Sequence, residues 1–253
     1  MSAFQGVKNL VGENKLKVLA NKNFLVIGIG GVGSWIAEFL IRSGAYHITL
    51  VDLDEICVTN INRQIHSNHK TIGKSKVLTM KERLLEINPK AKIHTIEDFL
   101  TASTIDDIIH PEVSFVFDAI DSVKNKCLII QKCKRLNIPF VIIGAAAQRV
   151  DPTKIILRDL NKSINDRLLF QVKKKLKKDY GYSKNSKRSY RAPAVYSTEL
   201  PLPLLTNKDD CEYRTGRISN CESGLGSVGF VTSAFASVAV SFAFKKICKI
   251  NDD

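Results

Sequence analysis

The sequence predicts an α/β fold: a Rossmann-like, mostly parallel sheet with helices on both faces, plus a smaller C-terminal extension. Short apolar runs alternate with helical segments through the first two thirds of the chain, which is typical of parallel sheets. The first apolar run leads into a glycine-rich stretch and a helix, as in nucleotide-binding folds. After about residue 150 this alternation stops. We therefore expect a Rossmann-like core at 1–150 and a C-terminal part at 151–253, together forming one continuous catalytic domain.

Strands are expected where short runs of Val, Ile, Leu and Phe suit burial on both faces of a sheet. These runs are residues 24–29, 48–51, 92–96, 115–117 and 140–143, with 154–158 as a further strand. Helices are expected where apolar residues recur at intervals of three or four. These segments are residues 32–42, 74–87, 124–136, 164–178 and 226–249. A proline-rich crossover (Pro193, Pro201, Pro203) precedes the last helix.

The composition is ordinary for a globular protein, with 44% hydrophobic and 25% charged residues, but the charge is unbalanced. The 38 Lys and Arg outnumber the 25 Asp and Glu and give a formal net charge of +13. Such an excess favours an anionic partner such as nucleic acid. A basic but otherwise ordinary enzyme surface is the alternative.

The cysteines and the apolar segments argue against several other classes of protein. The six cysteines contain no C-x-x-C pair, which disfavours a disulfide framework or a zinc site. The first ten residues lack the apolar run of a signal peptide. The longest apolar stretch, 228–244, is interrupted by Thr and Ser and is shorter than a membrane span. We expect it to form a buried helix in a cytoplasmic protein without membrane association.

The sharpest local motif is a set of four glycines, Gly28, Gly30, Gly31 and Gly33. Between a strand and a helix, glycines let the backbone turn tightly and approach a phosphate, which the helix N-terminus attracts. Asp52 ends the next strand, where a carboxylate can accept hydrogen bonds from ribose hydroxyls. Alone, this pattern predicts a nucleotide site with NAD as the default ligand. The alternative is glycines that only pack a helix against a sheet.

The residues beyond Asp52 favour a triphosphate over NAD. Arg63 and Lys76 bring positive charge beside the ribose carboxylate, and NAD, with only a pyrophosphate, would gain little from them. Asp121 follows another predicted strand, at the edge of the sheet where ligands bind, and is a candidate Mg²⁺ ligand. Each has a plainer alternative, because Lys76 could be a solvated helix residue and Asp121 an N-cap.

Several segments together resemble the E1-like (ThiF/MoeB) superfamily of adenylating enzymes. They are GIGGVGSW, VDLDEICVTNINRQIHSNH, GKSKV, INPKAKI and DAIDSV. CVTNINRQIHS, YSTE and CESGLGSVGF are most similar to the branch of tRNA threonylcarbamoyladenosine dehydratases. The likeness keeps its order and spacing from FQGVKNLVG to the final helix, so it covers nearly the whole chain.

The resemblance implies that the core binds ATP through the glycine loop, with its ribose on Asp52 and Mg²⁺ on Asp121. The other implied ATP contacts are Asp54, Asn60, Asn62, Arg63 and Lys76. Arg63, Lys76 and Asp121 would be catalytic. The two cations and the metal held by Asp121 would neutralise charge growing on the phosphates. Asp54 could instead only turn the chain. The family also suggests a monovalent cation (Na⁺ or K⁺), a homodimer, and cysteine desulfurase or sulfur-acceptor partners.

For this branch the resemblance implies ATP-dependent cyclisation of N6-threonylcarbamoyladenosine at position 37 of tRNA. Transfer of AMP turns the threonyl carboxylate into one with a good leaving group, and the neighbouring ureido group then attacks it with net loss of water. Because this nucleophile is intramolecular, no enzyme cysteine is required. We therefore expect Cys221 to be structural or incidental, with a nucleophile or sulfur acceptor as the alternative.

A basic segment supplies the candidate tRNA contacts. Residues 167–191 hold ten Lys or Arg and one acidic residue. The expected phosphate contacts are Lys173, Lys174, Lys177, Lys178, Lys184, Lys187, Arg188 and Arg191. Tyr180, Tyr182 and Tyr190 would stack on loop bases. The alternative is a lysine-rich helix end that is merely solvated.

Three other functions stay open. An enzyme that adenylates a ubiquitin-like sulfur carrier is disfavoured by the absent C-x-x-C pairs and the basic surface, and a non-catalytic scaffold by the intact set of charged residues. An NAD dehydrogenase is disfavoured by the phosphate-side cations.

One departure from the superfamily concerns the arginine that a partner subunit's N-terminal segment often supplies to the ATP site. Among the basic residues, only lysines precede the glycine loop here, and the first arginine is Arg42, so the sequence leaves open whether a partner subunit completes the ATP site.

Overall fold

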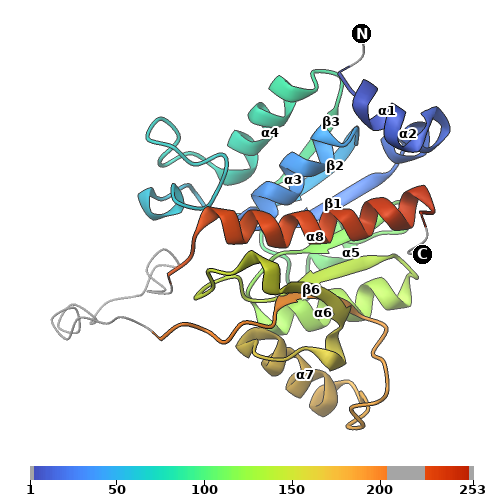
Figure 1. Ribbon diagram of the computed structural model, residues 1–253, viewed down its shortest axis with the longest axis vertical. Coiled ribbons are helices and arrows are strands. Elements are labelled where there is room, and N and C mark those ends of the chain that lie inside the picture. The colour runs from blue at the N-terminus through green and yellow to red at the C-terminus, as the bar shows by residue number, and fades with distance from the viewer. Residues whose placement is uncertain (1–2, 204–225, 251–253) are drawn as a thin grey trace, which may run out of the picture.

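A twisted sheet runs through the middle of the protein, with helices on both sides (Figure 1). The computed structural model describes residues 3–203 and 226–250. Within these residues the sheet has seven strands in the order β3-β2-β1-β4-β5-β7-β6, all parallel to their neighbours except β6, which runs antiparallel to β7. The strands are β1 Asn23–Ile27, β2 His47–Val51, β3 Lys92–Ile96, β4 Phe115–Asp118, β5 Phe140–Ile143, β6 Ile155–Asp159 and β7 Pro193–Ser197.

The helices cover the sheet as two layers. The α-helices are α1 Gln5–Val11, α2 Glu13–Ala20, α3 Gly33–Arg42, α4 Lys76–Ile87, α5 Ile105–Ile108, α6 Val123–Arg135, α7 Arg167–Asp179 and α8 Gly229–Cys248. Short 3₁₀ turns lie at η1 Val58–Asn60, η2 Pro152–Lys154 and η3 Leu160–Lys162. The buried residues of α2, α3, α4 and α8 form one apolar cluster, and those of α5, α6 and α7 form the other.

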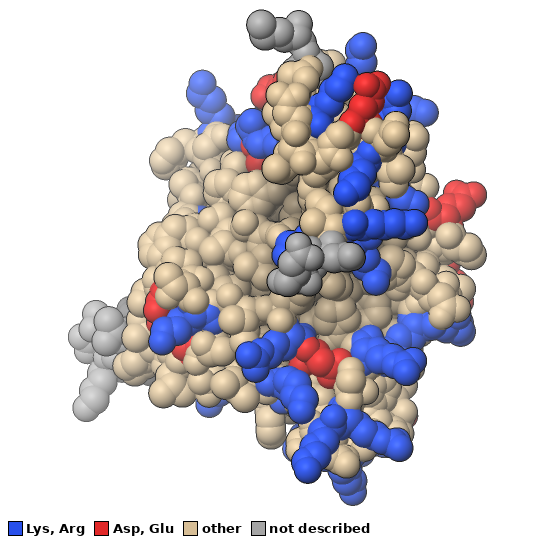
Figure 2. Space-filling model, turned by 45° about the vertical axis from the view of Figure 1, so that its right-hand side comes forward, with Lys and Arg blue, Asp and Glu red and all other residues tan. Residues whose placement is uncertain are grey.

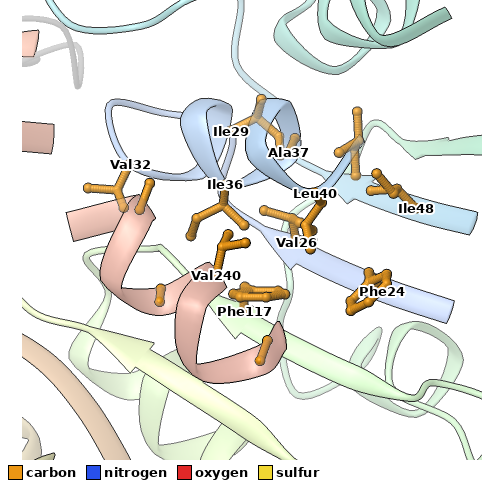
Figure 3. Packing of buried hydrophobic residues seen from close by; sticks show 14 of the residues in the cluster. Phe24, Val26, Ile29, Val32, Ile36, Ala37, Leu40, Ile48, Phe117 and Val240 are labelled. Atoms are coloured by element: carbon orange, nitrogen blue, oxygen red, sulfur yellow. The ribbon is translucent and has the colours of Figure 1, made fainter. Parts of the chain in front are cut away.

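Alternation along β1 explains how one strand serves both layers. Phe24 and Val26 point to the layer of α3 and α8, whereas Leu25 and Ile27 point to the layer of α6 and α7. Every residue of β1 after Asn23 is buried, as expected for a central parallel strand. Figure 3 shows the first cluster from close by, with side chains of β1, α3 and α8 packed together.

The predicted fold class is confirmed, and the structure adds elements that the sequence patterns did not reveal. The proline-rich crossover contains β7, which enters the sheet between β5 and β6 and begins at Pro193. The helices α1, α2 and α5 were also not predicted. Because β6 and β7 join the same sheet as β1–β5, the segment after residue 150 continues the core.

The last helix, α8, lies across one face of the sheet beside α3 (Figure 1). Its buried side includes Val231, Phe235, Ala239 and Ala243, as predicted for a packed helix. Among the residues that the structure describes, α8 alone is long and apolar enough to cross a membrane by length and composition. The packed core helix of a globular protein passes the same test.

The strand order fixes where a ligand can bind. β1 lies between β2 and β4, and the chain moves outward from β1 in both directions, to β3 on one side and to β5 on the other. In open parallel sheets, ligands bind beyond the carboxyl ends of the strands at this point of reversal. The glycine loop follows β1 there, with Asp52 after β2 and Asp121 after β4.

Candidate active site

The glycine loop requires glycine at two positions for steric reasons. Gly28 has a φ of +89°, and a Cβ there would lie 3.0 Å from the backbone of Ala119 at the end of β4. A Cβ on Gly33 would lie 1.7 Å from the Gly28 carbonyl oxygen, so α3 can begin this close to the strand only with glycine. At Gly30, by contrast, a Cβ would meet only Gln64, at 3.9 Å. The loop therefore leaves its backbone open to a ligand at Gly30.

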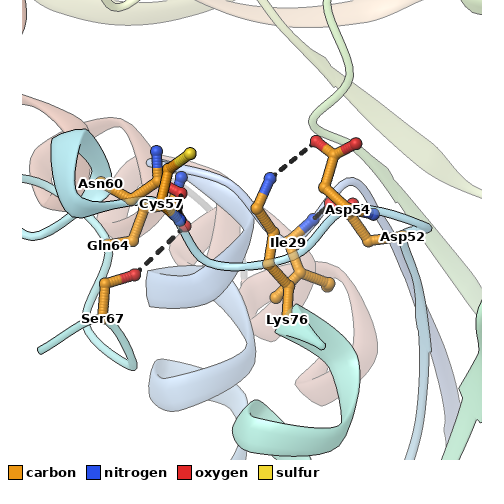
Figure 4. A network of polar contacts seen from close by, with 8 residues as sticks. All are labelled: Ile29, Asp52, Asp54, Cys57, Asn60, Gln64, Ser67 and Lys76. Carbon is orange, nitrogen blue, oxygen red and sulfur yellow. Dashed lines mark hydrogen bonds and ion pairs between the residues drawn. The ribbon is translucent and has the colours of Figure 1, made fainter. Parts of the chain in front are cut away.

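Asp52 is tied to the glycine loop. Its Oδ2 accepts a hydrogen bond from the Ile29 backbone N–H at 2.6 Å, and its Oδ1 accepts one from the Asp54 N–H at 2.9 Å (Figure 4). Burial raises the pKa of Asp52 above its usual value, and the charge of Lys76 and these hydrogen bonds oppose that shift. Each oxygen keeps a lone pair for a further donor, as ribose hydroxyls require.

Lys76 is brought to the site by a short pairing between two segments. Residues 54–56 run alongside residues 73–76, with hydrogen bonds from the Lys76 N–H to the Asp54 carbonyl and from the Ile56 N–H to the Lys74 carbonyl. The Lys76 Nζ then lies 2.7 Å from Asp54 Oδ2. Lys76 is buried at the start of α4, so its interpretation as a solvated helix residue is wrong. Asp54 orients this amine as well as turning the chain.

The loop at 58–64 is held in place by its own polar groups. Asn60 is buried, and its side-chain oxygen accepts a hydrogen bond from the Cys57 N–H, so it shapes the η1 turn. The Asn62 amide donates to the Ser227 carbonyl oxygen at 2.7 Å and accepts from the Arg63 guanidinium at 3.0 Å. Arg63 also donates to the Thr59 carbonyl oxygen at 2.6 Å. The contacts of Asn60, Asn62 and Arg63 with ATP stay predictions.

Asp121 is exposed in the turn after β4. Its predicted alternative role as a helix cap is wrong, because the Ser122 hydroxyl caps α6 by accepting from the Asn125 N–H. Beneath this turn, a fully buried ion pair joins Asp118 to Lys126, with 2.9 Å between Oδ1 and Nζ. Burial raises the pKa of Asp118, and the Lys126 charge opposes that shift. Sequence reasoning missed this pair, which anchors the turn that carries Asp121.

A second residue missed by sequence reasoning is His66, in the loop after η1. Its ring is buried, and neither ring nitrogen has a hydrogen-bond partner among the described residues. Burial, together with the charges of Lys76 and Arg83, lowers the pKa of His66 to about 3. His66 is therefore neutral at physiological pH and adds no charge beside Lys76.

These contacts gather the predicted residues around one loop. The backbone N–H groups of Ile29 and Asp54 both donate to the Asp52 carboxylate, and the Asp54 carboxylate pairs with Lys76. A Cβ on Gly31 would lie 3.3 Å from the Arg63 side chain, so that side chain borders the loop from another side. The contact of Gly28 with Ala119 brings in the turn that ends at Asp121. The arrangement places two cations and two groups of carboxylates around an open backbone.

A model of the ThiF family matches residues 5–253. The chain belongs to the ThiF family. It is similar to the tRNA threonylcarbamoyladenosine dehydratase of Escherichia coli K12, with 40% identity over 96% of this chain and 92% of the relative. The dehydratase of the same name from Haemophilus influenzae is 42% identical over 97% of this chain and 93% of its own length.

Solved structures agree with this membership of the ThiF family. The E. coli dehydratase TcdA in complex with AMP has a TM-score of 0.87 and 40% identity, covering 96% of this chain and 93% of that one. The same protein in complex with ATP has a TM-score of 0.86, with the same coverage. The resemblance deduced from the motifs is thereby confirmed.

The basic segment of this ThiF-family chain is only partly available to a ligand. Lys and Arg side chains gather at the lower end of the view in Figure 2, the end at which α7 lies in Figure 1. Lys174, Lys178, Lys184, Lys187, Arg188 and Arg191 are exposed. Lys173 and Lys177 are half-buried, and the Lys173 amine donates to the Ser163 carbonyl oxygen at 2.7 Å.

The prediction that Tyr190 stacks on RNA bases is wrong, and Tyr180 and Tyr182 are only partly exposed. Tyr190 is 3% exposed and belongs to the apolar core under α6 and α7. The Tyr182 ring packs edge-on against Tyr190, and Tyr180 packs against the same core. All three lie in a segment rich in Lys and Arg, but each packs on the apolar core. The loop that carries them is held to the rest of the protein by Asn161, whose amide donates to the Asn185 and Arg188 carbonyl oxygens.

Four of the six cysteines lie in the part of the chain that the structure describes. In the parts of the chain that the structure describes, Cys127, Cys133 and Cys248 are buried and Cys57 is partly buried, all as free thiols. Burial raises the pKa of Cys127 to about 11, so this thiol stays protonated. Cys221 lies outside the described residues.

Proposed function

We propose that this chain is an ATP-dependent tRNA threonylcarbamoyladenosine dehydratase. One observation carries the proposal: the similarity to dehydratases at 40–42% identity extends over 96–97% of the chain, including every element around the glycine loop. An ATP-bound relative of the same fold supports ATP as the nucleotide. The net charge of +13 suits a polyanionic substrate such as tRNA.

The residues of the site explain how a carboxylate could be activated. The open backbone at Gly30 and the N-terminus of α3 offer N–H donors to phosphate oxygens, while Asp52 accepts from the ribose. The guanidinium of Arg63 and the amine of Lys76 stabilise the charge that grows on the phosphates as AMP is transferred to the substrate carboxylate. The Asp54 carboxylate fixes the position of that amine before the substrate arrives.

Mg²⁺ fits this site through a single protein ligand. Mg²⁺ is usually held by one or two carboxylates together with phosphates and water, and the exposed Asp121 carboxylate meets that requirement. Asp121 would hold the ion, and the ion would draw charge from the phosphates. A monovalent cation (Na⁺ or K⁺) remains a further proposal. Turnover measured with each chloride salt in turn, against a tetramethylammonium control, tests it.

The experiment that tests the function compares two substrates. Purified protein with ATP and Mg²⁺ receives either threonylcarbamoylated tRNA or a ubiquitin-like sulfur-carrier protein, and nucleoside mass spectrometry follows the loss of one water. We expect that loss with the tRNA. Carrier-dependent pyrophosphate exchange without any change in the tRNA would instead favour a sulfur-carrier adenylating enzyme.

Variants separate the non-covalent route from a covalent one. Replacing Arg63 or Asp121 with Ala should lower turnover by about a hundredfold or more, because each removes charge stabilisation from the transition state. Cys221→Ala should keep the rate of the wild-type protein, because the attacking group belongs to the substrate. The reverse pattern would mean that a cysteine carries the reaction.

Assembly and location are also proposals. We propose a homodimer, which light scattering after gel filtration would detect as twice the mass of 28.2 kDa. We propose a cytoplasmic location because the substrate is a tRNA, and fractionation tests it. Partnership with a cysteine desulfurase or sulfur acceptor is tested by pull-down with the purified candidates. The N-terminal lysines Lys8 and Lys17 both pair with Glu13 in this structure.

A further inference from the structure

One exposed stripe on α7 has a composition that no part of the ATP site explains. The side chains on this stripe are Arg167, Phe170, Gln171, Lys174 and Lys178, which recur every three or four residues and are all exposed. Phe170 stands among them with 59% of its surface exposed, although the opposite side of the helix packs on the core through Leu169, Val172 and Leu176. An aromatic ring flanked by cations and an amide is therefore presented to solvent.

The same stripe borders a hollow at the ligand-binding edge of the sheet. The hollow has a volume of about 610 Å³ and is lined by Asn165, Asp166, Arg167, Phe170, Gln171 and Pro201. Asn165 and Asp166 precede α7, and Pro201 follows β7. Parallel β5 and β7 end on the same edge as β1, so the hollow and the glycine loop open at one edge of the sheet. Three strand spacings separate β1 from β7, which is about 14 Å.

The wall of the hollow is fixed in place before any ligand binds. The buried Asp166 carboxylate caps α7 by accepting from the Leu169 N–H and also accepts from the Ala145 N–H, each at 2.8 Å. The guanidinium of Arg149, itself buried, donates to the Asn165 carbonyl oxygen. These bonds join the start of α7 to the end of β5. Phe170, one turn into the helix, therefore holds its position relative to the nucleotide site.

From these observations we propose that Phe170 is a stacking platform for an unpaired base of the substrate tRNA, beside the base that is modified. Single-stranded RNA is recognised by splayed bases stacked on aromatic rings and by cations along the phosphates, and this stripe offers both. Arg167, Lys174 and Lys178 supply the cations, and Gln171 can donate to and accept from a base edge. The proposal rests on the proposed function and names how its substrate is held.

The test uses the full chain and an RNA stem-loop with 2-aminopurine at each loop position in turn. Stacking quenches the fluorescence of this base, so quenching reports the platform directly. We expect quenching at one position. Phe170→Ala should abolish it and weaken RNA binding by about 10- to 100-fold, whereas Phe170→Trp should retain both. Lys174→Gln should lower the slope of log affinity against log salt by about one.

Controls separate stacking from folding. Phe99, which is 49% exposed in the segment after β3, is the matched variant, and Phe99→Ala should bind RNA as the wild-type protein does. Phe170→Ala should also keep the wild-type affinity for ATP. If Phe170→Ala retains both the quenching and the RNA affinity within about twofold, there is no platform.

The outcomes also distinguish this proposal from the function on which it rests. A wild-type protein that dehydrates the modified tRNA while Phe170→Ala has an unchanged KM for tRNA refutes the platform alone. A wild-type protein that neither binds the stem-loop nor dehydrates the tRNA refutes the proposed function, and the platform with it.

Discussion

The glycine loop permits a test in which two neighbouring substitutions should fail for different reasons. Gly33→Ala places a methyl carbon 1.7 Å from the Gly28 carbonyl oxygen, and ordinary contact begins near 3.4 Å. The start of α3 must therefore retreat by about 1.7 Å from the strand. Overpacking of this kind costs about 1–3 kcal/mol, and the upper end applies because the neighbouring atom is backbone. For a chain of this size, that corresponds to a fall in Tm of roughly 6–12 °C.

Gly30→Ala should behave in the opposite way. Its added methyl group meets nothing closer than 3.9 Å, so Tm should stay within about 3 °C of the wild-type value. If ATP phosphates approach the backbone here, the methyl group displaces them. The loss of one charge-assisted hydrogen bond, about 1.5–3 kcal/mol, weakens ATP binding roughly 10- to 100-fold.

Thermal melts measure the Tm of both variants, and calorimetric titration measures their affinity for ATP. Gly33→Ala should lose stability and, because a displacement above 1 Å misaligns the reacting groups, at least about a hundredfold in rate. Wild-type ATP affinity in Gly30→Ala would refute the placement of the phosphates. Wild-type stability in Gly33→Ala would refute the steric argument for the loop.

Three further predictions concern charged and titratable groups. Lys76→Met removes the partner of Asp54 and a phosphate-side cation, so turnover assays should show a loss of about a hundredfold or more with little change in Tm. Lys126→Met leaves the Asp118 carboxylate buried and unpaired, and urea titrations should show a loss of about 3–5 kcal/mol that adding Asp118→Asn partly reverses. The pKa of His66 is about 3 in the folded protein and 6.5 in the unfolded chain, so between these values the unfolded chain binds the proton more readily. The contribution of His66 to the free energy of unfolding is therefore complete above pH 6.5 and is lost as the pH falls toward 3, by up to about 1.4 kcal/mol per pH unit. In urea titrations at several pH values, the free energy of unfolding of His66→Asn should therefore fall less steeply with acid than that of the wild-type protein. Equal slopes for the two proteins would contradict the lowered pKa of His66.

The strands β1, β4 and β5 were predictable because they are buried on both faces and read as short apolar runs. The strand β7 was not, because it begins at a proline and its signal is hidden in a proline-rich crossover. Proline lacks the N–H that a central strand needs, but Pro193 stands at the first position of β7, where a strand tolerates it. Its place between β5 and β6 depends on contacts between distant segments.

The candidate site likewise contains residues that the sequence could predict and residues that it could not. The glycines, Asp52 and Lys76 were found because a motif and a spacing define them. His66 and the pair of Asp118 and Lys126 carry no local pattern, since their roles come from burial by residues far away in sequence. The tyrosines were misplaced for a related reason. Basic neighbours made them look exposed, whereas the direction of each ring depends on how the loop is fastened to the body.

The hydrogen bonds between the loop at 58–64 and the start of α8 have a consequence for folding during synthesis on the ribosome. Asn62 donates to the Ser227 carbonyl oxygen, and the Thr232 hydroxyl donates to the Arg63 carbonyl oxygen, so the loop that carries Arg63 is supported by a part of the chain that is synthesised much later. A nascent polypeptide still holding α8 inside the ribosome therefore lacks a finished nucleotide site. We therefore expect little ATP-dependent activity before α8 has left the ribosome, and a chain truncated before α8 should be inactive.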